Sequence, residues 1–493
     1  MGELERRGEM LVWQAQDGED AGLVETHAVP EHLGPRGFQH RYRWAVWHGR
    51  TLAGMDWLAR DAAAVWHPFT QHSLWLSDEP TVVDRAEGPW LFDVDGNRYL
   101  DGISSLWVTT FGHRTPEIDA AIRSQLGRLD HATFLGATHV PGIELAERLL
   151  SVAPAAPGGP VLGKVFYAGD GSSAVEVALK MAYQHSVQAG GRGRPLFVHL
   201  QEAYHGDTLG AVSVGGISLF HAAYRPLLLR TLMVGSPGLR KPGQSAASRA
   251  EQAIAELADV MARHGDEVCA IVVEPMVQAA AGMLTYDASY LRAARRLATE
   301  HGALLICDEV ATGLGRTGRM WAVSHAGVVP DLLTCGKGLT GGYLPLSAVL
   351  ATNAVYESFL GSAASGRTFF HGHTYTANPL CCAAANANLE LIESRGLVAQ
   401  AAALGERLGS LLAPLASHDG VVEIRRLGTM TGVEVRSTGE RTGAVVCRAA
   451  RRHGVWLRPL GDTVVLMPPL ALGPSETDLL VGALALALDE VFG

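Results

Sequence analysis

From about residue 66 onward, short apolar runs alternate with segments of helical spacing along the chain. The apolar runs are β-branched or uninterrupted, which is typical of strands whose two faces are both covered. Runs of this kind predict strands at residues 164–168, 196–200, 269–274, 303–309 and 346–351. The segments 172–186 and 289–302, which lie between them, have the spacing of amphipathic helices. The alternation predicts an α/β fold around a parallel central sheet.

The pattern changes towards the C-terminus, which predicts a second domain. There a helix is followed by strands around 421–435 and 464–470 and then by a closing helix. This order predicts a smaller α+β domain at 386–493, onto which residues 59–110 fold. The remaining residues, 111–385, are then expected to form the large domain.

Residues 1–58 differ from the rest of the chain. They carry four tryptophans but no sustained helix or strand period. The first ten residues mix acidic and basic side chains, without the basic and apolar regions of a secretory signal. We expect residues 1–58 to be an extension, either a flexible arm or a stretch ahead of a natural start at Met55.

Composition narrows the classes of partner. The 493 residues are 47% hydrophobic and carry a formal net charge of −10. The apolar fraction suffices for a large core, and the negative charge argues against nucleic acid or an anionic membrane as the main partner. The longest uncharged stretch, 338–356, is interrupted by glycine, proline, threonine and asparagine, so it predicts no membrane span. The six cysteines form no C-x-x-C pair, which predicts buried, reduced thiols in a cytoplasmic protein.

A candidate anion site lies in the sequence FYAGDGSSAVEVALKMA at 166–182. The predicted strand ends at Ala168, and a glycine-rich turn then opens a helix. Gly171 lets the backbone approach a ligand, and the free N–H groups of a helix start favour an anion such as phosphate. Ser172 can add a hydroxyl donor. The alternative is an ordinary serine N-cap after a tight turn.

A second candidate is Asp308, at the end of the apolar run ALLICDEV. A carboxylate there is costly unless it meets a positive partner, and the C-terminal ends of parallel strands are where ligands bind. The alternative is an aspartate that caps a loop. Residues 313–318 match a dinucleotide fingerprint, which keeps an NAD-dependent oxidoreductase open. That match is weak, because three polar residues follow the strand and no clear helix follows the third glycine.

The chain has only four lysines, and Lys337 lies between two glycines in an uncharged stretch. A desolvated amine has a lowered pKa and suits a Schiff base, whereas the alternative is a surface lysine in a loop. Tyr204, in EAYHGDTLG, can stack on a flat ring. His371 and His373 have no carboxylate or cysteine at ligand spacing, so we expect no metal site.

These candidates share one ligand. Pyridoxal 5′-phosphate needs a phosphate cradle, an amine that binds it covalently and a carboxylate at its pyridine nitrogen. Their order along the chain resembles the class III aminotransferases of PLP fold type I. The resemblance covers residues 60–490. It rests on GDGSSAVEVALKMA, YHGDTLGAVSVG, VVEPMVQAAAGM, CDEVATGLGRTG, GKGLTGGYLPLSA and HGHTYTANPL.

The resemblance implies a large domain with a mostly parallel sheet, a smaller α+β domain and a homodimer with its active site at the interface. It implies that Lys337 binds pyridoxal phosphate covalently and moves a proton, and that Asp308 contacts the ring nitrogen. Tyr204 would stack on the ring, and Glu274 would support the site. The resemblance further implies phosphate contacts from Gly171, Ser172 and, across the interface, Thr374. It places at the substrate Trp66, Phe69, Trp107, Asp207, Arg316, Gly372 and Arg458, the last facing a substrate carboxylate.

Three further stretches resemble the branch of this family that works in biotin biosynthesis: VWHPFTQH, DGISSLWVTTFGHR and HGVWLRPLGDTVVLMPPL. The branch implies transfer of an amino group to 8-amino-7-oxononanoate, giving 7,8-diaminononanoate. Phe69 and Leu106 stand where many members have tyrosine and tryptophan, so the donor is either S-adenosylmethionine or lysine. The alternative is a class III enzyme acting on ornithine, GABA or another ω-amino acid.

Overall fold

The computed structural model describes residues 3–7, 10–14, 23–24, 56–190, 193–439 and 441–493. The chain divides into two compact units, Met1–Gly54 and Met55–Gly493. In the first unit an antiparallel sheet is formed by β1 (Glu3–Arg7), β2 (Met10–Gln14) and β3 (Leu23–Val24). The predicted extension at 1–58 falls mostly outside the described residues, and it stays a prediction.

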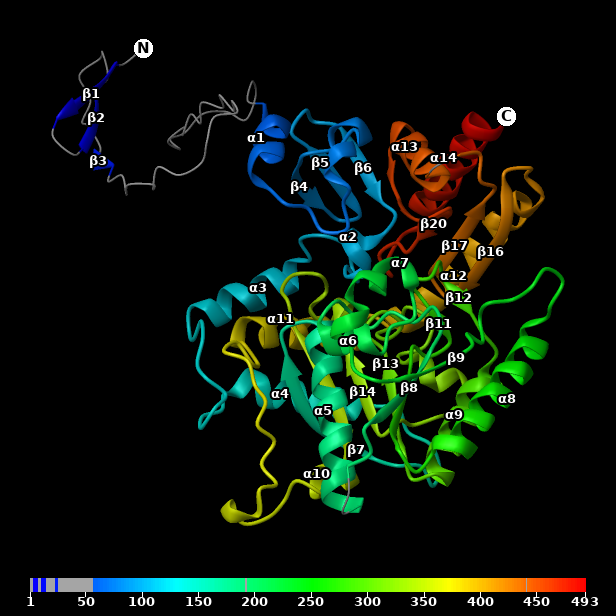
Figure 1. The fold of residues 1–493 in the computed structure, drawn as a ribbon. Coiled ribbons are helices and arrows are strands. Elements are labelled where there is room, and N and C mark those ends of the chain that lie inside the picture. Colours follow the sequence, from blue (N-terminus) through cyan, green and yellow to red (C-terminus); the bar gives the residue numbers. More distant parts are fainter. Residues whose placement is uncertain (1–2, 8–9, 15–22, 25–55, 191–192, 440) are drawn as a thin grey trace, which may run out of the picture. The chain divides into compact units, whose positions relative to one another are not determined.

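The second unit is built around a seven-stranded sheet (Figure 1). Its strand order is β7-β15-β14-β13-β10-β8-β9. The strands are β7 (Leu162–Ala168), β8 (Leu196–Leu200), β9 (Leu232–Val234), β10 (Val268–Val273), β13 (Leu304–Asp308), β14 (Leu332–Cys335) and β15 (Ser347–Thr352). All five predicted strands are present. The sequence did not predict β9 and β14, because their apolar runs are only three and four residues long.

The expected mostly parallel sheet is confirmed, with one antiparallel strand. β15 runs antiparallel to both of its neighbours, β14 and β7, whereas the other neighbouring strands pair in parallel. Only the loop at 336–346 and the short turn η5 (Lys337–Thr340) join β14 to β15. A parallel return needs a longer crossover, usually through a helix, so this connection yields an antiparallel neighbour.

Helices cover both faces of the sheet. Ile271, Val273 and Leu305 face one side, and their alternating neighbours Val272 and Ile306 face the other. The second side is covered by α5 (Gly171–Gly190) and α6 (Leu209–Ser213). The first is covered by α4 (Val140–Ser151), α8 (Ala246–His264), α9 (Ala288–Glu300) and α11 (Pro379–Ser394), with α3 (Pro116–Leu126) packed on α11. The strands are apolar on both faces because neither face meets water.

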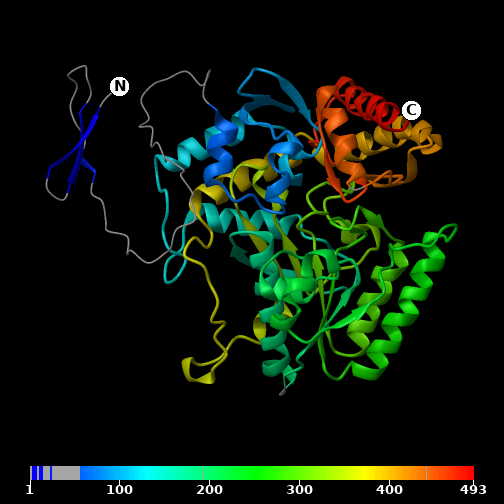
Figure 2. The same cartoon turned by 45° about the horizontal axis from the view of Figure 1, so that its top comes forward.

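Two four-stranded sheets lie at the other end of this unit (Figures 1 and 2). One is formed by β16 (Val421–Leu427), β17 (Met430–Val435), β20 (Thr463–Leu466) and β19 (Arg458–Leu460). The other is formed by β18 (Val455–Trp456), β6 (Arg98–Asp101), β5 (Trp90–Asp93) and β4 (Val83–Glu87). β18 pairs in parallel with β6, so chain segments from near both ends share a sheet. They also share a core with α12 (Leu397–Leu412), α13 (Thr442–Arg452) and α14 (Pro474–Phe492).

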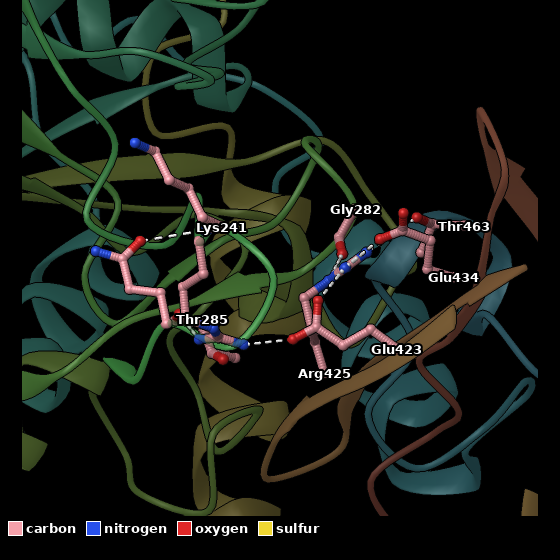
Figure 3. A network of polar contacts seen from close by, with 9 residues as sticks. Lys241, Gly282, Thr285, Glu423, Arg425, Glu434 and Thr463 are labelled. Atoms are coloured by element: carbon pink, nitrogen blue, oxygen red, sulfur yellow. Dashed lines mark hydrogen bonds and ion pairs between the residues drawn. The ribbon is translucent and has the colours of Figure 1, made fainter. Parts of the chain in front are cut away.

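A polar network joins the hairpin of β11 (Val277–Gln278) and β12 (Leu284–Thr285) to β16 and its neighbours (Figure 3). The buried Arg425 side chain donates to the carbonyl of Gly282 at 2.9 Å and to Glu423 at 2.8 Å. It also donates to Glu434 and to Thr463. The network therefore fixes the large sheet region against the C-terminal sheets.

Short elements complete the unit. The short helices are α1 (Trp57–Ala64), α2 (Ser104–Trp107), α7 (Ser218–His221) and α10 (Asn353–Glu357). The other 3₁₀ turns are η1 (His72–Leu74), η2 (Leu76–Asp78), η3 (Ala222–Leu227), η4 (Ala322–His325), η6 (Ala363–Ser365) and η7 (Ala413–Ser417). Within the described ranges, none of the helices has the length and apolar character needed to cross a bilayer.

Candidate active site

A cavity of about 560 Å³ opens at the C-terminal edge of the seven-stranded sheet. Its walls come from the turns that follow β7, β8, β10, β13 and β14. The C-terminal ends of these five strands meet at one edge, which is the usual ligand position in such sheets. The cavity brings together eight residues to which the sequence analysis gave a role, namely Trp107, Gly171, Ser172, Tyr204, Asp207, Glu274, Asp308 and Lys337.

Asp308 ends β13 and is 5% exposed. Its Oδ1 accepts hydrogen bonds from Thr334 Oγ1 at 2.9 Å and from the Val310 N–H at 3.1 Å. Its Oδ2 lies 2.7 Å from His205 Nδ1. Each carboxylate oxygen can accept about two hydrogen bonds, so Oδ2 keeps one acceptor position for a donor in the cavity.

The buried side chain of His205 is hydrogen-bonded to Asp308. A carboxylate can only accept a hydrogen bond. The N–H of this bond is therefore on Nδ1 of His205, which donates the hydrogen bond to Asp308. Burial acts to lower the pKa of His205, but the hydrogen bond and charge of Asp308 prevail and raise it. Among the described residues, Nε2 of His205 has no hydrogen-bond partner. Sequence reasoning placed His205 near Tyr204 and missed its bond to Asp308.

Lys337 directly follows the strand β14 and its glycine, with a left-handed φ of 40°. A left-handed backbone is uncommon for a residue other than glycine, and such residues are found more often at functional sites. Its Nζ lies 5.1 Å from the centroid of the Trp107 ring. Burial lowers the pKa of the Lys337 ammonium, although Asp308 and Glu274 act in the opposite sense. The amine is therefore more easily deprotonated than a surface lysine, which favours a nucleophile or a base.

Glu274 follows β10 and lies at the back of the cavity. One carboxylate oxygen accepts from the Tyr204 N–H at 3.0 Å and the other from the Ala279 N–H at 2.9 Å. Burial raises the pKa of Glu274 to about 7. The side chain thus fixes the main chain of the turn that carries Tyr204.

The predicted anion cradle is formed where α5 begins. Ser172 Oγ accepts from the Thr208 N–H and donates to Thr208 Oγ1, both at 3.0 Å. A Cβ on Gly171 would lie 2.7 Å from a Val310 methyl, and one on Gly206 would lie 2.3 Å from Ser172 Oγ. Only glycine fits at these two positions. In the described chain no acceptor meets the N–H groups of Gly171 and Ser172, so both can donate to an anion.

Tyr204 connects the cavity to more distant side chains. Its hydroxyl donates to Asp207 at 2.8 Å, and burial together with this bond raises the pKa of the Tyr204 phenol. Its ring meets the edge of Phe220 with a centroid separation of 6.2 Å. The Phe220 ring also contacts the ring of Phe69, which is predicted to lie at the substrate, with a centroid separation of 5.4 Å. Phe220 was not singled out from the sequence, since nothing local marks it as more than an apolar residue.

Two predicted arginines have different surroundings. The Arg458 guanidinium on β19 makes no hydrogen bond or ion pair with the described residues, and burial lowers its pKa. Arg316 is 3% exposed and donates to the carbonyls of Thr109 at 2.8 Å and Pro468 at 2.5 Å. Burial lowers the pKa of Arg316 to about 9. Arg316 does not line the cavity, because its nitrogens are bonded to the main chain behind it.

Besides Arg316, five predicted residues do not line the cavity of this single chain, namely Trp66, Phe69, Gly372, Thr374 and Arg458. Trp66 is 90% exposed. Gly372 and Thr374 are exposed on the segment that precedes α11. Their roles at the substrate and at the phosphate stay predictions.

Residues 75–488 match the family model described as aminotransferase class-III. The chain belongs to the class III aminotransferases. The adenosylmethionine-8-amino-7-oxononanoate aminotransferase of Nitratidesulfovibrio vulgaris is 49% identical over 434 residues, covering 85% of this chain and 79% of that protein. The enzyme of the same name from Geobacter sulfurreducens is 43% identical, covering 89% and 98%.

Solved structures agree with this assignment to the class III aminotransferases. The Methanocaldococcus jannaschii adenosylmethionine-8-amino-7-oxononanoate aminotransferase has a TM-score of 0.82 at 36% identity, covering 88% of this chain and 98% of that one. A sixfold mutant of the Pseudomonas jessenii omega transaminase has a TM-score of 0.83 at 28% identity, covering 89% and 99%. The predicted family, α/β fold class and aminotransferase activity are confirmed.

Proposed function

We propose that this aminotransferase transfers an amino group to 8-amino-7-oxononanoate, giving 7,8-diaminononanoate for biotin biosynthesis. The observation that carries the proposal is the set of relatives of one name, of which three are 49%, 43% and 41% identical to this chain. S-adenosylmethionine is the proposed donor, and lysine is the alternative because Phe69 and Leu106 differ from many members of the family.

The cavity fits pyridoxal 5′-phosphate, the proposed cofactor. The free N–H groups at Gly171 and Ser172 suit its phosphate, and the open acceptor position on Asp308 suits a protonated ring nitrogen. Lys337 and Tyr204 line the same space, where they can meet the aldehyde and the ring face. When bound, the cofactor supplies an electron sink for a carbanion at the substrate carbon.

Three side chains of the cavity have proposed roles in the reaction, namely Lys337, Asp308 and Trp107. Lys337 Nζ would be the base that takes the proton from the substrate carbon and delivers it to the carbon of the cofactor that carries the amino group, a role that its lowered pKa favours. Asp308, braced by Thr334 and His205, keeps a negative charge fixed at the position of the ring nitrogen. Trp107, packed by Lys337, excludes water from that side.

The substrate would be held by one charged group and by apolar walls. Arg458 has its donors free, and a guanidinium binds a carboxylate with two parallel hydrogen bonds. Trp107 and Phe69 offer apolar surface to a nine-carbon chain, while Asp207, held by Tyr204, can meet its amino group. The proposed homodimer would bring Gly372 and Thr374 of one subunit to the cavity of the other.

An amine or ω-amino acid transaminase is the second candidate. Omega transaminases match the fold at a TM-score of 0.83, with identities of 28% and 32%. The proposed location of the reaction is the cytoplasm, which is compatible with six cysteines that are all buried free thiols.

The test mixes cofactor-loaded protein with one donor at a time and follows the visible absorption of the cofactor. We expect S-adenosylmethionine to discharge the long-wavelength band and 8-amino-7-oxononanoate to restore it, with diaminononanoate detected by mass spectrometry. Discharge by lysine alone would move the proposal to the other donor. Turnover of simple amines or ω-amino acids without any diaminononanoate would overturn it.

A further inference from the structure

Residues 65–79, between α1 and β4, form a segment that we call the strap. It is braced by its own side chains and by α1. Asp61 Oδ2 accepts from Trp75 Nε1 at 2.7 Å and lies 2.8 Å from His67 Nε2. The His67 and Trp75 rings stack with a centroid separation of 4.0 Å. These contacts hold residues 67 and 75 of the strap together and to α1.

One end of the strap is fastened to α13 by a cluster of arginines. Arg441 donates to both carboxylate oxygens of Asp78, at 3.0 and 2.7 Å, and Arg448 donates to Oδ1 at 3.2 Å. Arg451 donates to the Asp78 carbonyl at 3.4 Å and to Thr81 Oγ1 at 3.1 Å. Three guanidinium groups thus converge on one aspartate and the turn beside it.

Elsewhere in the strap, Phe69 contacts Phe220, but this contact holds it weakly. Phe69 has a left-handed φ of 51° and presents its ring to the edge of Phe220, which contacts Tyr204. It remains 58% exposed, so this ring contact buries little surface. Five hydrogen bonds join the arginine cluster to Asp78 and Thr81, against this single ring contact, so we take the cluster as the main attachment of the strap.

We propose that Asp78 is a positioning residue for the acceptor substrate, because it pins the strap to α13 and thereby sets Phe69 against Phe220, which contacts the cavity residue Tyr204. Asp78 touches neither the cavity nor the reacting groups. Loss of its carboxylate should weaken acceptor binding and leave the chemistry intact. This inference rests on the proposed function for the identity of the acceptor.

The test compares Asp78→Asn with a matched control, Asp478→Asn. Asp478 receives two hydrogen bonds from Arg407, at 2.6 and 2.7 Å, and this pair joins α14 to α12 without contacting the strap. We expect Asp78→Asn to raise KM for 8-amino-7-oxononanoate roughly fivefold, as for a networked surface ion pair. We expect kcat and the rate of the donor half-reaction to stay near wild type. The control should leave all three unchanged, and an equal effect of Asp478→Asn would overturn the proposal.

A double-mutant cycle asks whether Asp78 acts through Phe69. If it does, Asp78→Asn should add nothing to the KM of a Phe69→Ala protein. Additive effects on KM would overturn the positioning role, as would a fall in kcat with KM unchanged.

A readout without substrate separates this inference from the proposed function. Chymotrypsin should cut the strap near Trp66 and Phe69 several times faster in Asp78→Asn than in wild type or Asp478→Asn, as read by mass spectrometry. Faster cleavage supports the anchor even if the wild-type protein fails to use 8-amino-7-oxononanoate. Equal cleavage in all three proteins would overturn the anchor.

Discussion

The floor of the cavity and the strap above it are fixed in different ways. On the floor, His205, Glu274 and Asp308 are between 4% and 5% exposed, and each is bonded to strand ends or to the main chain. On the strap, Trp66 and Phe69 are 90% and 58% exposed, and the attachment consists of side-chain ion pairs. The groups proposed for chemistry are therefore held rigidly, whereas the surface proposed for the substrate can adjust.

Two arginine networks repeat this contrast. Arg425, in Figure 3, is 5% exposed and satisfies the carbonyl of Gly282 and two glutamates. The Arg441 side chain at Asp78 is 48% exposed and competes with water. Burial makes the first network costly to break, while solvent and salt weaken the second.

The largest expected effect is on the floor, at Lys337. We expect Lys337→Ala to lower kcat by at least about a thousandfold, because Lys337 is the one amine among the described residues that line the cavity and could bind the cofactor or move a proton. Activity and the visible absorption of the loaded protein measure the change. Lys241→Ala, at an exposed lysine, is the control and should retain both. Residual activity above one tenth of wild type in Lys337→Ala would contradict the assigned role.

The next effect concerns stability and the two arginine networks. We expect Arg425→Met to lower the free energy of unfolding by about 2–3 kcal/mol, since it leaves the buried carbonyl of Gly282 and the carboxylate of Glu434 without this donor, while Glu423 keeps its bond from Arg240. Arg441→Met should cost less than about 1 kcal/mol, because its pair is half in water. Urea denaturation of both variants gives the comparison. Equal losses would remove the distinction between the two networks.

A smaller effect is expected at His205. His205→Leu should lower kcat roughly tenfold, because Asp308 loses a charge-assisted hydrogen bond that holds its orientation. His205→Asn keeps an N–H donor close to the position of Nδ1, so it should recover most of the rate. The pH dependence of the cofactor's visible absorption should shift in the leucine variant. A shift of equal size in the asparagine variant would indicate that the charge, not the donor, matters.

A further effect is a pH dependence of stability from Glu274. Burial raises the pKa of this carboxyl from 4.5 to about 7, so the folded protein binds a proton in this window that the unfolded chain has lost. Its contribution to stability is therefore complete below about pH 4.5, falls as the pH rises and is lost above about pH 7. Glu274→Gln should make the decline shallower. The rest of the slope should persist through Glu309, whose pKa burial also raises to about 7. Urea unfolding midpoints of the wild type and of Glu274→Gln between pH 5 and pH 8 measure this dependence. An identical dependence on pH in the two proteins would contradict the raised pKa of Glu274.

The sequence by itself determined the core strands, the start of α5 and the gathering of Gly171, Asp308 and Lys337 at one edge of the sheet. Each of these features has a local sequence signal, namely an apolar run that ends at a glycine turn or at a polar residue. Parallel strands place their C-terminal ends at the same edge of the sheet, which brings these residues together. Only the tertiary structure decided the antiparallel course of β15, the bond from His205 to Asp308 and the main-chain contacts of Arg316. The ion pair of Asp78 and Arg441, which are 363 positions apart in the sequence, is likewise formed only by the tertiary structure. Such partners depend on topology and strand register, and no local pattern of residues encodes a contact made across the whole fold.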